Sequence, residues 1–177
     1  VLLGYWTVGN YNGLVKMDVR IDEAWSQVEN QYQRRFELIP NLVETVKGVA
    51  NFEASTYEAV TKARSAWAEA LQAGSRAERI SAVNSVETSL ARLLATIENY
   101  PDLKAQANFS TLQAQIEGTE NRIAIARQDY NEAVTPYNTR TRTFPSSLIA
   151  GLFGFEKEAF FESDLAAEKA PQVEFSE

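Results

Sequence analysis

The feature that most constrains this chain is an apolar repeat that extends over about four heptads in its C-terminal half. The repeat advances by alternating steps of three and four through Phe109, Leu112, Ile116, Thr119, Ile123, Ala126, Tyr130, Ala133 and Tyr137. Such a seam is typical of a helix that packs at roughly 20° against its neighbours, as in a coiled coil. It predicts one helix from about Asp102 to Asn138, which is about 55 Å long at about 1.5 Å per residue.

Two earlier stretches show the same helical spacing. The first carries Leu14, Met17, Ile21, Trp25, Val28, Tyr32, Phe36 and Ile39. Pro40 lacks an N–H, so the pattern must kink or restart there, with Pro40 in a first turn. The second stretch carries Leu42, Val46, Val49, Val60, Ala63, Trp67 and Leu71. Glu53 and Tyr57 interrupt this second stretch, and Gly74 ends it.

A third helix is predicted after Ser75, which can cap it together with Glu78 in a capping box. Its apolar residues are Ile80, Val83, Val86, Leu90, Leu93, Leu94 and Ile97. No segment shows the period-two alternation of a strand, so the predicted fold is all-α. We expect an elongated antiparallel bundle of about four long helices with heptad-like packing, preceded by the end of an N-terminal membrane helix. The expected core includes Trp25, Phe36, Trp67, Ile116, Ile123 and Tyr130.

The residue types present exclude most familiar catalytic sites. With no His and no Cys, the chain has no Ser-His-Asp triad, cysteine nucleophile, thiolate zinc site or Glu-x-x-His di-iron site. We therefore expect no enzyme activity, no catalytic or cofactor-binding residue and no metal. The alternative is a carboxylate-based metal-binding or enzymatic bundle that uses Asp22 with Glu23, Glu29 with Glu37, or Asp129 with Glu132. Arg34 and Arg35, with Glu37, are expected on a solvated face.

The formal net charge of −7 argues against nucleic acid as a partner, since the Lys and Arg residues are scattered among acids. The residues from Glu156 to Glu177 carry seven acids against Lys157 and Lys169, which predicts a solvated acidic tail. The expected organisation is therefore an apolar segment over residues 1–9, a helical bundle over 10–155 and an acidic tail over 156–177.

The apolar opening of the chain has two interpretations. A membrane span needs about 20 apolar residues, more than this opening holds. The favoured interpretation is the last two turns of a transmembrane helix, an anchor to the lipid bilayer. It is formed by Val1, Leu2, Leu3, Tyr5, Trp6 and Val8. The other is a lead-in that packs on the body or groove of a soluble domain.

The segment from Phe144 to Phe155 is crowded with apolar residues, two glycines and Pro145. It can close the end of the bundle, or it can be a hook for a partner, a second copy or an anionic membrane beside Arg140 and Arg142. The candidate interaction residues are Phe144, Leu148, Ile149, Leu152, Phe153 and Phe155. As a contact between copies, it would make the protein a homo-oligomer that Phe153→Glu dissociates without unfolding the domain.

Longer motifs lie at both ends of the chain. Those of the N-terminal part are Asn10–Val15, Ala24–Val28 and Gln33–Gly48. Those of the C-terminal part are Ala124–Val134, Tyr137–Asn138 and Phe144–Phe155. Together they resemble the LemA family, whereas residues 65–108 are less distinctive.

The resemblance implies a bacterial protein with a single N-terminal transmembrane helix, a short outside N-terminus and a helical bundle in the cytoplasm. The family has no established activity or catalytic residues, so it supplies no site residue, and one relative suggests a role in organising membranes. The expected function is a non-enzymatic, membrane-anchored helical scaffold or interaction protein, whose protein partner the sequence does not identify. Sidedness stays open, because Lys16 and Arg20 are offset by neighbouring acids.

Overall fold

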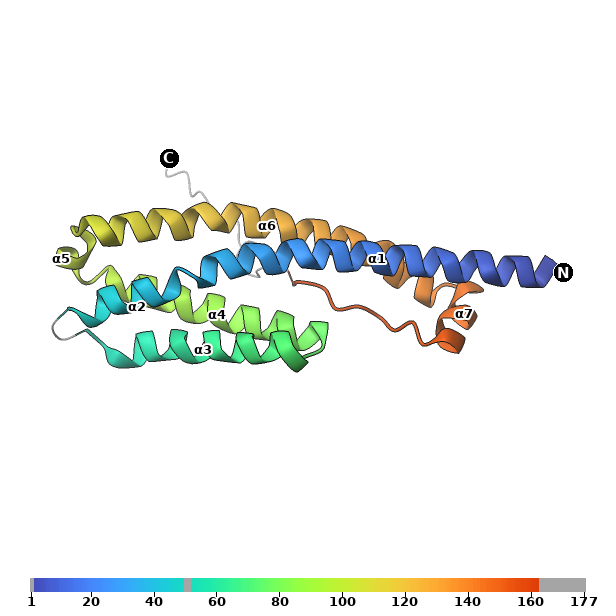
Figure 1. Cartoon of the computed structure of the whole chain (residues 1–177), viewed down its shortest axis with the longest axis horizontal. Coiled ribbons are helices and arrows are strands. Elements are labelled where there is room, and N and C mark those ends of the chain that lie inside the picture. The colour runs from blue at the N-terminus through green and yellow to red at the C-terminus, as the bar shows by residue number, and fades with distance from the viewer. Residues whose placement is uncertain (1, 50–51, 163–177) are drawn as a thin grey trace, which may run out of the picture.

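The protein is a bundle of helices in a computed structural model that describes residues 2–49 and 52–162. Within those ranges the regular elements are all helices, which confirms the all-α prediction. They are α1 (Leu2–Phe36), α2 (Ile39–Lys47), α3 (Ala54–Ala73), α4 (Arg76–Ile97), α5 (Pro101–Lys104), α6 (Ala107–Arg142) and α7 (Ser146–Phe153). Figure 1 shows α1 and α6 side by side along the length of the molecule.

The molecule has two unlike halves along its long axis. The hairpin of α3 and α4 packs beneath α1, α2 and α6 at one end only (Figure 1). We call this part the four-helix half (residues 22–129 as far as they are described) and the rest the two-helix half (residues 2–21 and 130–162). In the two-helix half, α1 and α6 are accompanied by α7 and by an extended strap (residues 155–162).

The structure confirms the restart at Pro40 but divides the second predicted stretch. Pro40 lies in the first turn of α2, and Gly48 caps that short helix. The chain then reverses before α3, so Leu42 and Trp67 reach the core from two different helices. The reversal has its own packing, because the Phe52 ring contacts the rings of Tyr57 and Tyr100. Tyr57, which breaks the helical stripe in the sequence, thus belongs to the turn contact.

The predicted capping box at the start of α4 is present. Ser75 accepts a hydrogen bond from the Glu78 N–H at 3.3 Å, and Glu78 accepts one from the Ser75 N–H at 2.6 Å. The bond from the Ser75 N–H to the Glu78 carboxylate, followed by the Ser75 hydroxyl, lowers the pKa of Glu78 below its ordinary value. The cap satisfies two backbone donors at the tip of the α3–α4 hairpin, where the four-helix half begins.

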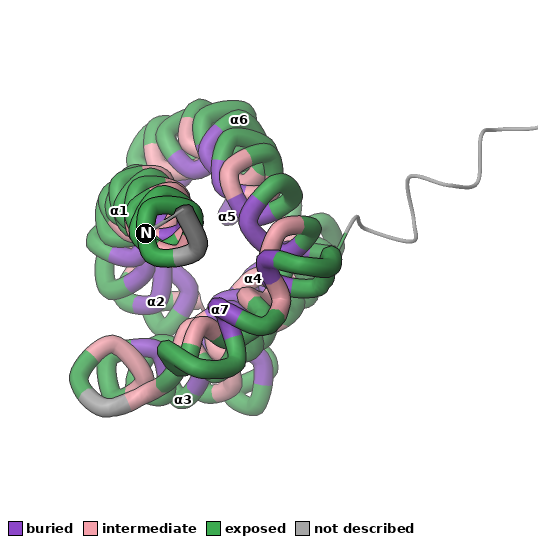
Figure 2. The backbone as a smooth tube through the Cα atoms, turned by 90° about the vertical axis from the view of Figure 1, so that its right-hand side faces the viewer, coloured by how far each residue is buried: buried purple, intermediate pink, exposed green. Residues whose placement is uncertain are grey.

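The core follows the predicted stripes. Every residue named above for the expected core is buried: Trp25, Phe36, Trp67, Ile116, Ile123 and Tyr130. Aromatic side chains link the helices, with the Trp67 ring at 5.6 Å from Phe36 and the Trp25 ring at 5.4 Å from Tyr130. Figure 2, a view along the bundle, shows buried positions on the helix faces that point at one another.

Arg35 corrects one expectation about the surface. Its side chain is not solvated but only 5% exposed, and it pairs with Glu87 of α4 at 3.2 Å. Arg127 of α6 lies over the Tyr32 ring at 5.5 Å. Burial, and then the charge of Glu87, raise the pKa of Tyr32. The four-helix half therefore encloses a charged cluster that helical periodicity alone did not reveal.

The N-terminal segment is the first part of α1, which continues unbroken into the bundle (Figure 1). Val1 lies outside the described residues, and the side chains of Leu2 and Leu3 are not described. Among residues 2–49 and 52–162, no helix has the length and apolar character that a membrane crossing needs.

Candidate functional site

The short helix α7 has one buried face and one exposed face. Ser146, Ile149 and Ala150 are buried against the bundle, and the Ser146 hydroxyl lies 2.7 Å from the Arg140 carbonyl. Of the six candidate interaction residues, Ile149 is buried and Phe155 is half-buried. The other four, Phe144, Leu148, Leu152 and Phe153, are exposed. The segment therefore closes the bundle with one face and presents the other outward.

The exposed face of α7 lies beside the N-terminal turns of α1. The Tyr11 ring is 4.9 Å from the Phe153 ring and 5.7 Å from the Phe155 ring. Three candidate anchor residues of α1, Tyr5, Trp6 and Val8, are also exposed at this end. The fold thus brings together two segments separated by more than a hundred positions in the sequence (Figure 1). We call this surface the apolar end, formed by Tyr5, Trp6, Val8, Phe144, Leu148, Leu152 and Phe153.

Arg140 fixes the last turn of α6 to α1. Its Nη2 donates to Asn10 Oδ1 at 3.1 Å, and its guanidinium passes over Gly13. A Cβ at Gly13 would lie 2.8 Å from Arg140 Nη2, so the missing side chain permits this close approach. Arg142, two residues further on, is exposed. A guanidinium therefore lies just behind the apolar end, and a second is free to face solvent or an anionic surface.

The strap is held by side-chain amides of α6, a feature that the sequence analysis missed. Asn138 donates to the Glu158 carbonyl at 2.9 Å and accepts from the Glu158 N–H at 2.8 Å. Asn131 makes the same pair of bonds with Phe161, at 2.8 and 2.9 Å. The signal was present in the sequence, because two asparagines seven positions apart lie on one face of a helix.

Ring contacts and ion pairs complete the attachment of the strap. The Phe161 ring stacks on Trp25 at 5.9 Å, and Tyr130 Oη donates to the Ala159 carbonyl at 2.8 Å. Arg76 binds Glu158 at 2.8 Å and Asp22 at 2.6 Å. The strap thus ties α6 to α1 and to the tip of α4. Residues 156–162 of the predicted tail run along the bundle, and the remainder lies outside the described residues.

Burial and acidic neighbours change the proton affinity of two groups near the strap. Burial, followed by the charges of Asp18 and Glu158, raises the pKa of Tyr137 to about 12. Burial, followed by the charge of Asp22, raises the pKa of Asp18. Burial is the largest cause for both groups, so these shifts reflect packing.

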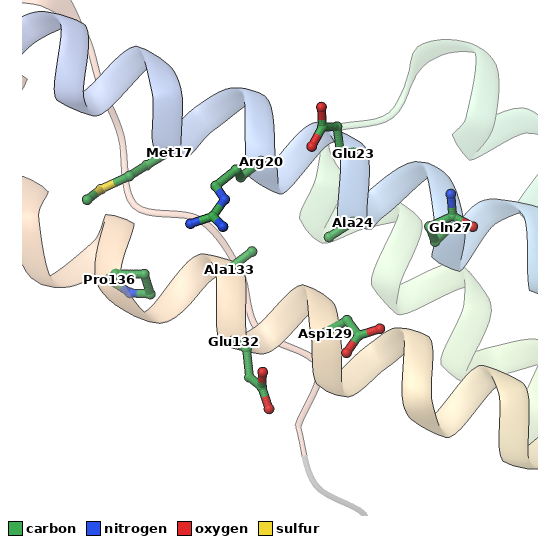
Figure 3. Close-up of a pocket in the computed structure, with 9 residues that line it drawn as sticks. All are labelled: Met17, Arg20, Glu23, Ala24, Gln27, Asp129, Glu132, Ala133 and Pro136. Carbon is green, nitrogen blue, oxygen red and sulfur yellow. The ribbon is translucent and has the colours of Figure 1, made fainter.

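The candidate carboxylates do not form a metal centre. Glu29 accepts from Trp25 Nε1 and pairs with Arg79 at 2.9 Å, while Asp22 is engaged by Arg76. Figure 3 shows a groove between α1 and α6 where the carboxylates of Glu23, Asp129 and Glu132 point in different directions. Within residues 2–49 and 52–162, no group of three or more metal-binding side chains comes together. The metal-binding or enzymatic alternative thus has no support among the described residues.

Comparison with known proteins places the chain among LemA-type sequences. The sequence model of the LemA family matches residues 24–175. Magnetosome proteins MamQ 1 and MamQ 2 of Paramagnetospirillum magneticum are each 26% identical over 181 residues, which cover 89% of this chain and 66% of the relative. Protein LemA of Metamycoplasma hominis is 26% identical over 157 residues, which cover 88% of this chain and 70% of the relative. The chain thus spans 66% of the length of the two magnetosome relatives.

Proposed function

The chain belongs to the LemA family, and from this premise we propose that it is a non-enzymatic, membrane-anchored helical scaffold. In this proposal the N-terminal turns of α1 attach the protein to a bacterial membrane as the end of a single-pass anchor. The four-helix half then carries the surface offered to protein partners or to further copies of the chain. The sidedness of the bundle, with its bulk in the cytoplasm, is part of the same proposal.

The observation that carries the proposal is the exposure of the first turns of α1. Tyr5 is 84% exposed, and Trp6 and Val8 are exposed beside it. The lead-in interpretation expected these residues to pack on the body of the domain, whereas α1 extends them away from the four-helix half (Figure 1). A cluster of exposed apolar side chains at one end of a helix favours contact with a nonpolar phase, and Trp and Tyr are the residues enriched at membrane interfaces.

A scaffold is favoured over an enzyme by the residue types and by the site geometry. The chain has no His or Cys, and the charged side chains that the bundle does bury are engaged, as in the pair of Arg35 with Glu87. None of the names of the relatives above describes a reaction. The proposal therefore assigns the protein a role in binding and placement.

Fractionation of the natural protein, expressed from its complete gene, tests the anchor. We expect it in the membrane pellet, and we expect it to stay there after an alkaline carbonate wash that strips peripheral proteins. The matched control is the same protein with Tyr5→Ser, Trp6→Ser and Val8→Ser, which keeps all charges and weakens only the apolar turns. Wholly soluble natural protein would contradict the anchor.

A measurement of mass tests the scaffold role. Native mass spectrometry of the protein purified from its own membranes should show copies or partner chains bound to it. The contacts are expected on the four-helix half, so cross-links should map there. A protein that leaves the membrane as a single chain under gentle detergent, with no cross-links to any other chain, would argue against a scaffold.

A further inference from the structure

We propose that α7 is a second membrane contact, whose exposed face inserts between the headgroups of an anionic lipid bilayer beside the N-terminal turns of α1. The face consists of Leu148, Leu152 and Phe153, and exposed Phe144 lies two residues before the helix. This inference rests on the proposed membrane attachment and deepens it. It places a short internal helix, more than a hundred residues from the anchor in sequence, in the same lipid surface.

The charge distribution of the chain singles out this end. Residues 1–17 and 133–155 contain Lys16, Arg140 and Arg142 but no Asp or Glu. The chain as a whole has a formal net charge of −7, so its entire acidic excess lies in the other residues. These two segments are basic on an otherwise acidic protein, which complements the negative surface of anionic lipids. The acids nearest to them along the chain, Asp18 and Glu156, line a hollow beside Phe153.

The length and shape of α7 fit an interfacial helix. Its eight residues are far fewer than the about 20 needed to cross a bilayer, so it must lie at the surface of the lipid. The side chains of Leu148 and Leu152, one turn apart, lie on the same side of the helix, and both are exposed, unlike Ser146, Ile149 and Ala150. The buried face holds α7 on the protein. The exposed face is available to contact the boundary between the lipid headgroups and the acyl chains.

The face is presented in a fixed orientation. Ser146 bonds back to α6 at the start of the helix, as described above. Gly154 ends it in the left-handed conformation (φ 75°), which a residue with a side chain rarely adopts, and turns the chain into the strap. Both ends of α7 are thereby tied. The N-terminus of α1 and α7 also lie at the same end of the bundle, so one lipid surface can contact both (Figures 1 and 2).

A site-specific fluorescent probe tests the insertion. Because the chain has no Cys, Leu152→Cys supplies a unique thiol on the exposed face of α7 for a polarity-sensitive dye. The matched control is Ser110→Cys, an exposed position near the start of α6 at the far end of the molecule. Each labelled protein is mixed with vesicles of phosphatidylglycerol and phosphatidylcholine, and vesicle binding is measured in parallel by flotation.

The inference requires a blue shift of the dye at position 152 on addition of vesicles and no shift at position 110. Flotation without a shift at position 152 would overturn the inference while leaving the proposed anchor intact. Failure to float would remove both. A blue shift that develops without vesicles as the protein concentration rises would identify a second copy as the occupant, and would also overturn it.

A second pair of variants tests the charge argument. Arg142→Gln removes an exposed cation behind α7, and we expect it to weaken binding to the anionic vesicles by about fivefold, the effect typical of one cation near such a surface. Lys104→Gln removes an exposed cation near the opposite end, in α5, and should leave binding unchanged. Equal losses from both substitutions would show that the lipid does not select this end, and the proposed orientation would be wrong.

Discussion

The two halves of the molecule complete their interiors by different means. In the four-helix half, apolar stripes of four helices face one another, and rings such as Trp67 and Phe36 fill the space between them. In the two-helix half, α1 and α6 have no helical hairpin beneath them, and a strap of extended chain takes its place. Two helices cannot enclose a core by themselves. The difference shows that extended backbone can cover a helix pair in place of a helical hairpin, provided that side chains of the helices form hydrogen bonds with that backbone.

The chemistry of attachment differs accordingly. Apolar burial in the four-helix half is nondirectional and large, whereas the strap depends on bonds to Asn131 and Asn138 that contribute about 0.5 to 1.5 kcal/mol each. We therefore expect the two-helix half to open at a lower free energy than the whole bundle. The following predictions test that difference.

The largest effect is expected from a cavity in the four-helix half. Ile123 is 4% exposed, and Ile123→Ala should lower the free energy of unfolding by about 2 to 5 kcal/mol, since truncation leaves a cavity in the seam. Ile125, two residues along the same helix, is 53% exposed, so Ile125→Ala should cost less than about 0.5 kcal/mol. Chemical denaturation followed by circular dichroism measures both. Equal losses would mean that the seam has been assigned to the wrong face of α6.

A smaller and local effect is expected from the strap. Asn138→Asp removes the donor to the Glu158 carbonyl and puts a carboxylate against that oxygen, which should cost about 1 to 3 kcal/mol. The amide hydrogens of Glu158 and Phe161 should then exchange faster, while those of α3 and α4 keep their protection. Asn121→Asp, an exposed change on the same helix, is the control. Faster exchange throughout the bundle would show that the two halves unfold together.

The cap at the start of the four-helix half gives a third, smaller change. Ser75→Ala removes the side-chain acceptor for the Glu78 N–H and should lower the free energy of unfolding by about 1 kcal/mol. Ser81→Ala, at an exposed position inside α4, should be neutral or slightly stabilising because alanine favours helix. Thermal melts of the two variants compare them directly. A cap variant as stable as the Ser81 variant would mean that the hairpin tip contributes nothing to the four-helix half.

The last prediction concerns an effect confined to alkaline pH, in the two-helix half. Tyr137 has a pKa raised to about 12 from an ordinary value of 10. Below pH 10 it is neutral in both states, and its contribution is fully present. Between pH 10 and 12 only the unfolded chain loses the proton, so the free energy of unfolding should fall.

Tyr137→Phe should make the fall in the free energy of unfolding between pH 10 and 12 shallower. Below pH 10 the substitution should not change how the free energy of unfolding depends on pH. Denaturation curves at several pH values measure the slope. The wild-type chain at each pH is the control, since the other tyrosines are common to both proteins. An unchanged slope in the variant would show that Tyr137 does not retain its proton through burial.

The sequence predicted the four-helix half well because its interior is built from residues that recur with helical period. The stripe from Trp25 to Ile39 and the seam through Ile123 both face the core, and the capping box at Ser75 is in place. The reversal before α3 was missed, because residues on two antiparallel helices continue the same apolar spacing. Arg35 was assigned to solvent because its pairing with Glu87 joins positions more than fifty residues apart.

The two-helix half was less predictable for a physical reason. The strap has no apolar period of its own, and its partners Asn131 and Asn138 are polar residues that a helical pattern assigns to the surface. The apolar composition of the segment singled out the candidate residues of α7. It did not show that Ile149 is buried and Leu152 exposed, because the end of α6 determines which side of α7 packs on the bundle. The contact of the Phe153 ring with Tyr11 was likewise not predictable, because it joins residues that are far apart in the sequence.

The asparagine contacts also determine how the protein responds to mechanical load. Along α6, Asn131 and Asn138 form two rungs, and any tension from the chain beyond Glu162 reaches the rung at Phe161 before the rung at Glu158. A pull directed away from α6 loads the two asparagine contacts one after the other, the first together with the Phe161 ring contact and the second together with the Glu158 ion pair. A pull along the helix axis loads both together and meets more resistance. The same attachment is therefore weak in one direction and strong in another, and part of the load passes to the four-helix half through Trp25 and Arg76.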